Sequence, residues 1–129
     1  MSKQIEVSAK LVIRVGDRVL MLRRKDGSNI FPGGHVEYGE SINDCLKREA
    51  LEELSYTLEI APEYFSMYEY IASDGAKHAL ILHYLLVLPS RQDFLLGDDE
   101  AGSELIWHTR EDLAKIIPDA GFIRKAFAD

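Results

Sequence analysis

The chain has 129 residues and a formal net charge of −7, with 47% hydrophobic and 29% charged residues, which is the size and composition of one globular domain spanning residues 1–129. No apolar run reaches the roughly eighteen residues of a membrane span, and the first ten residues carry no apolar signal core, so we expect a cytoplasmic protein that does not enter membranes. The negative charge disfavours binding to a nucleic-acid duplex, because such binding depends on Lys and Arg side chains that neutralise phosphates.

Two strands and a turn are predicted near the start of the chain. Segments Lys10–Val15 and Arg18–Arg24 are rich in apolar residues and flank Gly16-Asp17, which has the composition of a two-residue hairpin turn. A loop is expected at Lys25–Ser28. The next segment, Ile30–Val36, is expected to be short and extended, and it carries the sequence Phe-Pro-Gly-Gly.

A helix is predicted from about Ser41 to Leu54. Ser41 and Asp44 have the spacing of a capping box, in which the Ser side chain accepts from a free backbone amide and the acidic side chain reaches back. The lone cysteine, Cys45, falls in this helix and is expected to be a packed side chain, because free Cys is often buried. One Cys makes neither an internal disulfide nor a zinc cluster.

The second half of the chain is predicted to add extended segments and then helices. The extended segments are Thr57–Ile60, Tyr64–Ala72, Lys77–Leu88 and Glu104–His108. Of these, Lys77–Leu88 is apolar at nearly every position, which predicts a central strand. Ser90–Ser103 reads as a polar loop. A second capping pattern at Thr109 opens a helix that ends by Pro118, and Gly121–Ala128 is amphipathic. This order indicates an α+β fold, an α/β/α sandwich with a mixed sheet and two or three helices.

Three glutamates share one face of the predicted helix. Glu49, Glu52 and Glu53 stand at i, i+3 and i+4, which places them on one side of a helix that turns about 100° per residue. The residues expected to face the core are Ala50, Leu51 and Leu54.

This acidic face has two interpretations. Like charges repel by a few tenths of a kcal/mol per exposed pair, which a solvated surface helix tolerates, and the Glu-x-x-Glu-Glu pattern alone favours that interpretation. The same face would also suit a hard divalent cation, which takes carboxylate oxygens and shares its remaining shell with phosphates. Because the face lacks His and Cys, Mg²⁺ or Mn²⁺ fits it better than zinc.

The spacing around the face decides between the two interpretations. From Gly34 the sequence runs Gly, five residues, Glu40, seven residues, then Arg48-Glu49-Ala50-Leu51-Glu52-Glu53, one residue, and Ser55-Tyr56. This resembles the Nudix box, G-x5-E-x7-R-E-U-x-E-E-x-G-U with U apolar. Six fixed identities match, and their chance occurrence in a chain of this length has a probability on the order of 10⁻⁵. The chain is therefore similar to the Nudix hydrolase superfamily and to its MutT-like members.

Ser55 is the one departure within the box. The family has Gly there, and Gly commonly closes a helix in a left-handed conformation that costs Ser about 1 kcal/mol. Ser55 occupies no ligand position, so the departure concerns the turn rather than the chemistry. Outside the box, Phe31-Pro32-Gly33 and Trp107 on the last predicted strand are also usual for MutT-like members.

The resemblance implies a fold and an activity. Nudix domains have a mixed sheet between helices, with the box as a loop–helix–loop. They use Mg²⁺ to hydrolyse the pyrophosphate link of a nucleoside diphosphate joined to another group. For a short, plain domain the favoured small-molecule substrate is a nucleoside triphosphate, oxidised ones included. The alternative is ADP-ribose or a nucleotide sugar.

The resemblance also implies roles for residues of the box. The expected metal ligands are Glu49 and Glu53, then Glu52, together with the backbone carbonyl of Gly33. Arg48 is expected to orient a box glutamate through a charge-assisted hydrogen bond.

Supporting roles are expected for other residues of the box loop. Glu40 is expected to support the loop rather than to bind the ion. Gly34 and Gly39 are expected to adopt dihedral angles that suit glycine.

The general base is expected either among the box glutamates or in a loop outside the box. The substrate contacts are expected outside the metal ligands. Some family members use a box glutamate as the base, and others use an acidic residue in the loop before the last strand. Here that loop offers Asp98, Asp99, Glu100 and Glu104. Glu100 is the favoured candidate. Arg23 or Arg24 is expected to contact a phosphate, and His35 is expected to line the site.

The remaining histidines and aromatic residues are expected to be structural. Phe31, Tyr38 and Phe122 are interpreted as core or rim residues rather than base-stacking ones. His78 and His83 alternate with apolar residues on a long strand and are interpreted as satisfied structural histidines.

Two rival hypotheses compete with an enzyme. One is a Nudix-fold nucleotide-binding or regulatory module that has lost catalysis, which the intact Arg48, Glu49, Glu52 and Glu53 disfavour. The other is an acidic α+β domain with an accidental box, which the chance estimate makes remote. The sequence leaves open the exact substrate, the number of metal ions, and whether the chain forms a homodimer.

Overall fold

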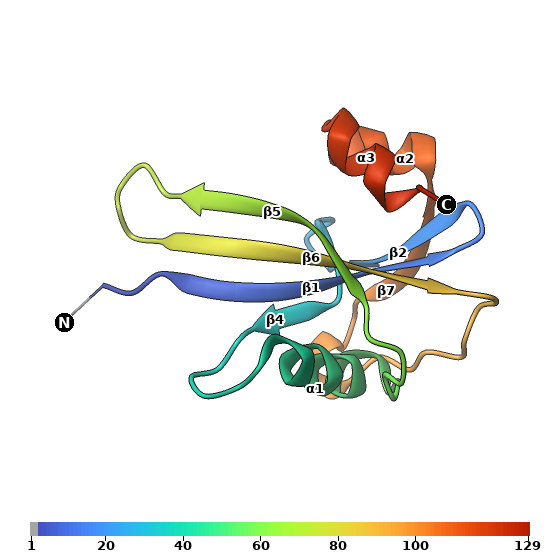
Figure 1. Cartoon of the computed structure of the whole chain (residues 1–129), viewed down its shortest axis with the longest axis horizontal. Helices are drawn as coiled ribbons and strands as arrows, with labels where there is room; N and C mark the ends of the chain where they lie inside the picture. Colours follow the sequence, from blue (N-terminus) through green and yellow to red (C-terminus); the bar gives the residue numbers. More distant parts are fainter. Residues whose placement is uncertain (1–2) are drawn as a thin grey trace.

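The computed structural model describes residues 3–129, and it contains one seven-stranded sheet with helices on both faces (Figure 1). In chain order the elements are β1 (Glu6–Val15), β2 (Arg18–Arg23), β3 (Asn29–Ile30), β4 (Gly33–His35), α1 (Ile42–Leu54), β5 (Glu63–Ile71), β6 (His78–Leu88), the 3₁₀ turn η1 (Asp98–Glu100), β7 (Glu104–Thr109), α2 (Arg110–Ile116) and α3 (Ala120–Ala126). The α/β/α sandwich predicted from the sequence is confirmed. None of the helices within residues 3–129 is long and apolar enough to cross a bilayer.

Strand β1 lies inside the sheet and pairs with β2, β4 and β6. It pairs in parallel with β6 over its whole length, from Glu6 opposite Ala79 to Val15 opposite Leu88. On its other edge it pairs with β4 over residues 8–10 and with β2 over residues 14–15, both antiparallel. Between the two pairings Val12 and Ile13 have no strand partner on that edge among the described residues, while the Leu11 amide donates to the Pro32 carbonyl at 2.8 Å.

The two faces of β1 bury two separate cores, because successive side chains of a strand point in opposite directions. On one face, Ala9, Leu11 and Ile13 pack against α1. On the other, Val12 packs with residues of α2 and α3, including Leu113. Figure 1 shows α1 below the sheet and the α2–α3 pair above it.

The predicted caps are present at the helix starts. Ser41 Oγ accepts from the Asp44 amide at 3.1 Å, and Thr109 Oγ1 accepts from the Asp112 amide at 3.2 Å. Asp119 caps α3 in the same way through Phe122, at 3.1 Å. These bonds satisfy amides that have no partner within their own helix.

Two expectations for the α1 region are wrong. Thr57–Ile60 forms no strand, because its Leu58 turns into the core under α1 and takes the segment off the sheet. Leu51 is 58% exposed, while Glu53, expected on the open face, is only 9% exposed. The reason is a loop that packs along this side of α1, with the Gly97 amide donating to the Glu53 carbonyl at 3.0 Å.

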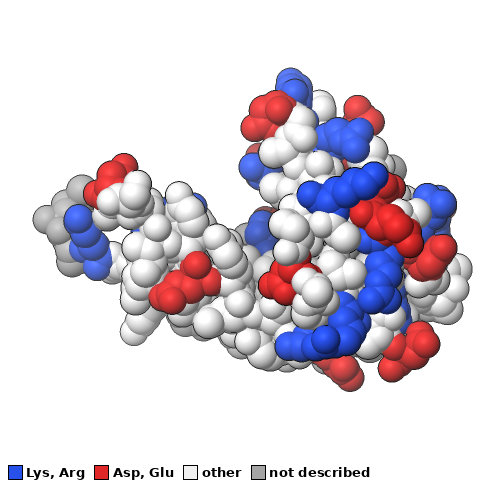
Figure 2. All heavy atoms as spheres, turned by 90° about the horizontal axis from the view of Figure 1, so that it is seen from above, with Lys and Arg blue, Asp and Glu red and all other residues white. Residues whose placement is uncertain are grey.

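The sheet extends beyond the helices as a narrow arm. Figure 2 shows this arm projecting from the body, and its surface has fewer charged side chains than the body. The edge strand β5 carries exposed large apolar side chains, namely Tyr64, Met67, Tyr68, Tyr70 and Ile71. On the face seen in Figure 2, basic and acidic side chains of the body are intermixed, so this face offers no continuous basic track for a nucleic-acid backbone.

Ser55 closes α1 in the left-handed conformation, with φ of 54° and ψ of 36°. Its hydroxyl donates to the Leu95 carbonyl at 3.0 Å. We predict that Ser55→Ala lowers the free energy of unfolding by about 1 kcal/mol, because it keeps the left-handed backbone and loses this bond. Ser55→Gly is predicted to preserve or raise stability, since Gly adopts this conformation without strain. Urea unfolding of the three proteins checks the order, and a glycine variant less stable than the alanine variant would contradict it.

Candidate functional site

Arg48 is the centre of the polar network on α1. Its Nε and Nη2 atoms donate to the two carboxylate oxygens of Glu40 at 2.7 and 3.0 Å. Its Nη1 donates to Glu49 at 2.9 Å and to Glu52 at 3.5 Å. Nη2 also donates to the His35 carbonyl at 3.1 Å. Because the guanidinium is a rigid planar fork, these bonds fix the orientation of the acidic side chains and join the box loop to the helix.

The network determines the charge state of its members. Hydrogen bonds from Arg48 and from the Glu37 amide lower the pKa of Glu40 from 4.5 to about 2. The bond to Glu40 in turn raises the pKa of Arg48. Burial raises the pKa of the Cys45 thiol to about 11, and Cys45 is fully buried. The cysteine is therefore a packed side chain, as predicted, and not a nucleophile.

Two glutamates of α1 lie against the backbone of β4, at Gly33 and Gly34. Glu53 Oε1 accepts from the Gly33 amide at 3.0 Å. The Glu49 carboxylate lies so close to Gly34 that a Cβ there would collide with it. Gly34 therefore permits the approach of a carboxylate rather than an unusual dihedral angle. The positive φ angles of this region fall on Gly33, at 136°, and Gly39, at 84°.

The donor set at this turn suits a hard divalent cation. Burial and the adjacent Glu49 raise the pKa of Glu53 well above its usual range, which shows that the two carboxylates crowd each other. A cation between them relieves such repulsion. Within residues 3–129 no three His, Cys, Asp or Glu side chains are already grouped as a complete metal site. A bound Mg²⁺ would therefore complete its shell with water, a backbone carbonyl and substrate oxygens, as this ion commonly does.

Lys10 enters the site from the sheet, and sequence reasoning missed it. It lies on β1 opposite Gly33 of β4, and its Nζ donates to the carbonyls of Phe31 and Gly33, both at 3.4 Å. Burial lowers the pKa of Lys10, while the charges of nearby carboxylates, including Glu53 and Glu100, oppose that change. The available signal was a lysine inside an otherwise apolar strand.

The loop before β7 carries Glu100 to the same place. A Cβ on Gly97 would collide with the backbone of Glu52, so Gly97 allows the loop to lie directly on the end of α1. Glu100 is only 8% exposed. It accepts from Ser103 Oγ at 3.0 Å and faces Arg24 at 3.7 Å. The other acidic residues of this loop, Asp98, Asp99 and Glu104, are exposed.

The remaining site residues predicted from the sequence are less closely gathered. Glu52 is exposed and is held toward Arg48. The His35 side chain is not brought to the carboxylates: it follows Gly34 on a strand, points the other way, and lies 3.7 Å from Glu6. Arg23 is exposed at the end of β2 and pairs in the sheet with Asn29.

A hollow of about 410 Å³ lies on the opposite face of the sheet from α1. Its lining residues include Asn29, Met67, His83, Asp119 and Phe122. His83 on β6 is the sheet partner of Lys10 on β1. Lys10 therefore lies beside His83 in the sheet, while its Nζ bonds to the carbonyl of Gly33, whose amide donates to Glu53.

His83 is buried among aromatic rings at the base of this hollow. The rings of Phe31 and Phe122 lie 5.7 and 5.0 Å from its own. Burial, together with the charge of Lys10, lowers the pKa of His83 to about 4, so its ring is neutral near pH 7. Its Nδ1 is buried with no hydrogen-bond partner within residues 3–129. The expectation that His83 is a fully satisfied structural histidine is therefore wrong.

Comparisons with known proteins agree with this arrangement. The family model for the NUDIX domain matches residues 4–129. The uncharacterized Nudix hydrolase YvcI of Bacillus subtilis is 29% identical over 109 residues, which cover 81% of this chain and 66% of that protein. The m7GpppN-mRNA hydrolase NUDT17 of Xenopus laevis is 32% identical over 127 residues, which cover 84% of this chain and 42% of that protein. The chain thus spans less than two thirds of each of these relatives.

Solved structures share the fold. The crystal structure of a MutT NUDIX hydrolase from Burkholderia pseudomallei matches with a TM-score of 0.74 at 24% sequence identity. The match covers 85% of this chain and 87% of that one. The comparison supports the sheet topology and the position of α1 against the sheet.

The bond between Arg48 and Glu40 has a consequence for pH dependence. A carboxylate whose pKa is depressed in the folded state contributes stability above its unfolded pKa and loses it as pH falls through the folded pKa. We predict that the wild-type protein has a higher Tm than the Glu40→Gln variant at pH 6, and that the difference disappears as pH falls from about 4.5 to about 2. Thermal unfolding at several pH values measures this, and a difference that does not change with pH would contradict it.

Proposed function

The chain belongs to the NUDIX domain family, and on that premise we propose that it is a Mg²⁺-dependent pyrophosphohydrolase whose substrate is a nucleoside triphosphate. One observation carries the proposal: Glu49 and Glu53 both lie against the backbone of β4 at Gly33 and Gly34, where Lys10 also bonds. In the proposed complex the phosphates of the triphosphate lie beside these carboxylates and its base lies in the hollow at His83, the sheet partner of Lys10.

Glu49, Glu53 and the Gly33 carbonyl are the proposed metal ligands, with Glu52 at the exposed margin of the same face. When bound, Mg²⁺ supplies charge neutralisation for the phosphate oxygens and lowers the pKa of the attacking water. Arg48 holds Glu49 in place through its 2.9 Å hydrogen bond. Glu53 is positioned separately, by a hydrogen bond from the Gly33 amide. Each of the two carboxylates therefore has its own hydrogen-bond donor.

Glu100 is the proposed general base. In the reaction the oxygen of water bonds to one phosphorus, the bond from that phosphorus to the bridging oxygen breaks, and the other phosphate leaves with that oxygen. The Glu100 carboxylate takes the proton of the water. Its burial and its hydrogen bond from Ser103 Oγ support this role, because a catalytic base needs a fixed position and a free oxygen lone pair.

Lys10 and Arg24 are the proposed phosphate-binding residues. Lys10 Nζ is held only by two carbonyls at 3.4 Å, and an anionic phosphate is a stronger partner for an ammonium group than a carbonyl is. Arg24 lies 3.7 Å from Glu100. The two cations flank the proposed path of the phosphates and offset charge that develops on them in the transition state.

The hollow at His83 is the proposed subsite for the base. Its aromatic and apolar lining suits a planar ring, and the buried Nδ1 of His83 has no partner within residues 3–129. A hydrogen-bonding group on the base would satisfy this atom, and leaving such an atom unpaired is unfavourable. Asn29 and Asp119 at the rim add further polar contacts.

A turnover assay tests the function. Purified protein with Mg²⁺ is offered ordinary and oxidised nucleoside triphosphates, ADP-ribose, nucleotide sugars, dinucleoside polyphosphates and capped RNA. We predict the highest kcat/KM for a nucleoside triphosphate. The Glu53→Gln variant is predicted to lose more than about 10²-fold in kcat with the fold retained, because it removes a ligand of the ion that activates water.

Variants of two lysines serve as the matched comparison. Lys10→Met is predicted to raise KM for the triphosphate about 10-fold through loss of a charge-assisted contact. Lys47→Met, a change at an exposed position of α1, is predicted to leave both kinetic constants unchanged. Faster turnover of ADP-ribose or a nucleotide sugar would replace the proposed substrate. No hydrolysis of any compound with Mg²⁺ or Mn²⁺ would instead favour a non-catalytic binding module.

A further inference from the structure

Arg14 is a buried cation without a partner. It lies near the end of β1, between Val19 of β2 and Val87 of β6, and it is only 7% exposed. Its Nε is buried and makes no hydrogen bond within residues 3–129. No carboxylate oxygen of the described residues lies within 4.0 Å of an Arg14 nitrogen, the limit for an ion pair. A buried Nε–H without an acceptor is unfavourable, which points to a missing partner, and the positive charge of the guanidinium favours an anionic one.

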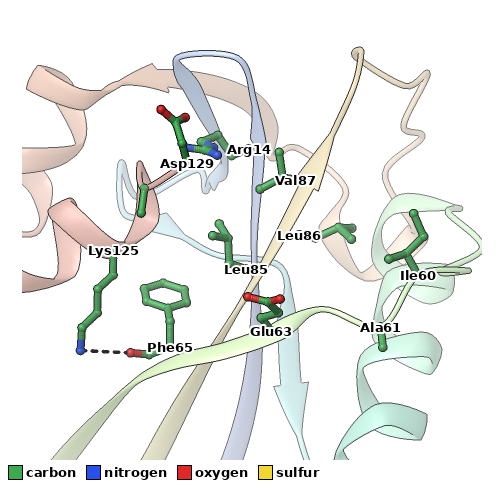
Figure 3. Close-up of a pocket in the computed structure, with 11 residues that line it drawn as sticks. Arg14, Ile60, Ala61, Glu63, Phe65, Leu85, Leu86, Val87, Lys125 and Asp129 are labelled. Carbon is green, nitrogen blue, oxygen red and sulfur yellow. Dashed lines mark hydrogen bonds between the residues drawn. The ribbon is translucent and has the colours of Figure 1, made fainter.

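Arg14 borders a hollow of about 530 Å³ that shares no lining residue with the one at His83. Figure 3 shows it between α3 and the ends of β5 and β6, with Phe65 and Leu85 forming an apolar wall. A second cation, Lys125, lies on the α3 side, and within residues 3–129 its Nζ donates to the Phe65 carbonyl alone, at 3.4 Å. The hollow therefore combines two weakly engaged cations with an apolar surface.

We propose that this hollow binds a small organic anion, a compound with one carboxylate or phosphate group on an apolar body. The anionic group bonds to the guanidinium of Arg14, while Lys125 adds positive charge at the α3 side of the hollow. The apolar body packs on Phe65, Leu85 and Val87. Small-molecule sites commonly have this composition, an apolar lining with a few polar groups that fix orientation. The site is separate from the carboxylates of α1 and does not rest on the proposed reaction.

Two acidic residues of the lining limit what the hollow accepts. Glu63 and Asp129 also border it, and Figure 3 shows Asp129 beside Arg14. The formal charges of the four ionisable lining residues therefore cancel. Repulsion from the two carboxylates disfavours a polyanion such as a nucleoside triphosphate. A ligand with a single anionic group is the better match.

Methyl NMR with a metal chelator present tests the proposal, with hexanoate and hexyl phosphate as anionic probes and hexanol as the neutral control. We predict that at least one anionic probe shifts the Leu85 and Val87 methyl signals with a Kd of about 1 mM or tighter. Arg14→Met is predicted to weaken this binding at least about 10-fold, the loss expected for one charge-assisted contact. Arg124→Met, at an exposed position of α3 outside the lining, is predicted to leave it unchanged. The probe that binds more tightly, hexanoate or hexyl phosphate, identifies the preferred anionic group.

Three outcomes of the NMR experiment would overturn the proposal. They are the absence of a shift with both anionic probes, equal shifts with hexanol, and unchanged affinity in the Arg14→Met variant.

Thermal unfolding without a probe separates ligand binding from a structural role. If the role of Arg14 is to bind a ligand, the Arg14→Met variant has a Tm equal to or higher than that of the wild-type protein, because an apolar side chain of similar length replaces an unpaired buried charge. If Arg14 instead pairs with Asp129 in solution, Arg14→Met and Asp129→Asn both lower the Tm and the double variant lowers it no further. That second result would contradict the proposed site.

Discussion

The site depends on one interaction, the fork of hydrogen bonds from Arg48. Glutamates at successive turns of a helix repel one another, and a helix face that carries three of them is unfavourable without compensation. Arg48 supplies that compensation by bonding Glu40 through two nitrogens and Glu49 through a third. Because Glu40 lies in the loop before α1 and His35 ends β4, the same side chain also fixes the loop and the end of β4 against α1. The acidic face is therefore both charged and rigid, which a metal site requires.

The sheet supplies the second constraint. Its central strand changes partner on one edge, from β4 to β2. Lys10 lies at the end of the β4 pairing, where it bonds to the Gly33 carbonyl and is the sheet partner of His83. The carboxylates of α1 and the aromatic hollow lie on opposite faces of the sheet, with Lys10 on the strand between them. The proposed substrate, a nucleotide, has its base at one end and its phosphates at the other and is assigned to both places.

Local sequence rules predicted the parts of this structure that local interactions determine. The caps at Ser41 and Thr109 depend on residues three apart, and the spacing of the box places Glu49 and Glu53 on one turn of α1. What sequence missed depends on distant contacts. Glu53 is buried rather than open because a loop more than forty residues later packs against it through Gly97. Lys10 stands out locally only as a lysine within an apolar strand, and its partners Phe31 and Gly33 are distant in sequence.

The same distinction explains Leu51. Helical periodicity assigns Leu51 to the core, but the loop at Gly97 packs on the Glu53 side of α1, and Leu51 is 58% exposed. His35 stays a prediction as a substrate-binding residue, and its side chain lies 3.7 Å from Glu6. Periodicity therefore predicts the direction of a helical side chain, while tertiary packing decides which directions are buried.

The central claim is that Glu49 and Glu53 together hold a divalent cation. Titration of Mn²⁺, followed by the loss of its free-ion EPR signal, measures this directly in the presence of a non-hydrolysable nucleoside triphosphate. Glu49→Gln and Glu53→Gln are each predicted to weaken Mn²⁺ binding by at least about 10-fold, as loss of a metal contact commonly does. Glu59→Gln, at an exposed position after α1, is predicted to bind Mn²⁺ as the wild-type protein does. Equal affinity in all four proteins would contradict the claim.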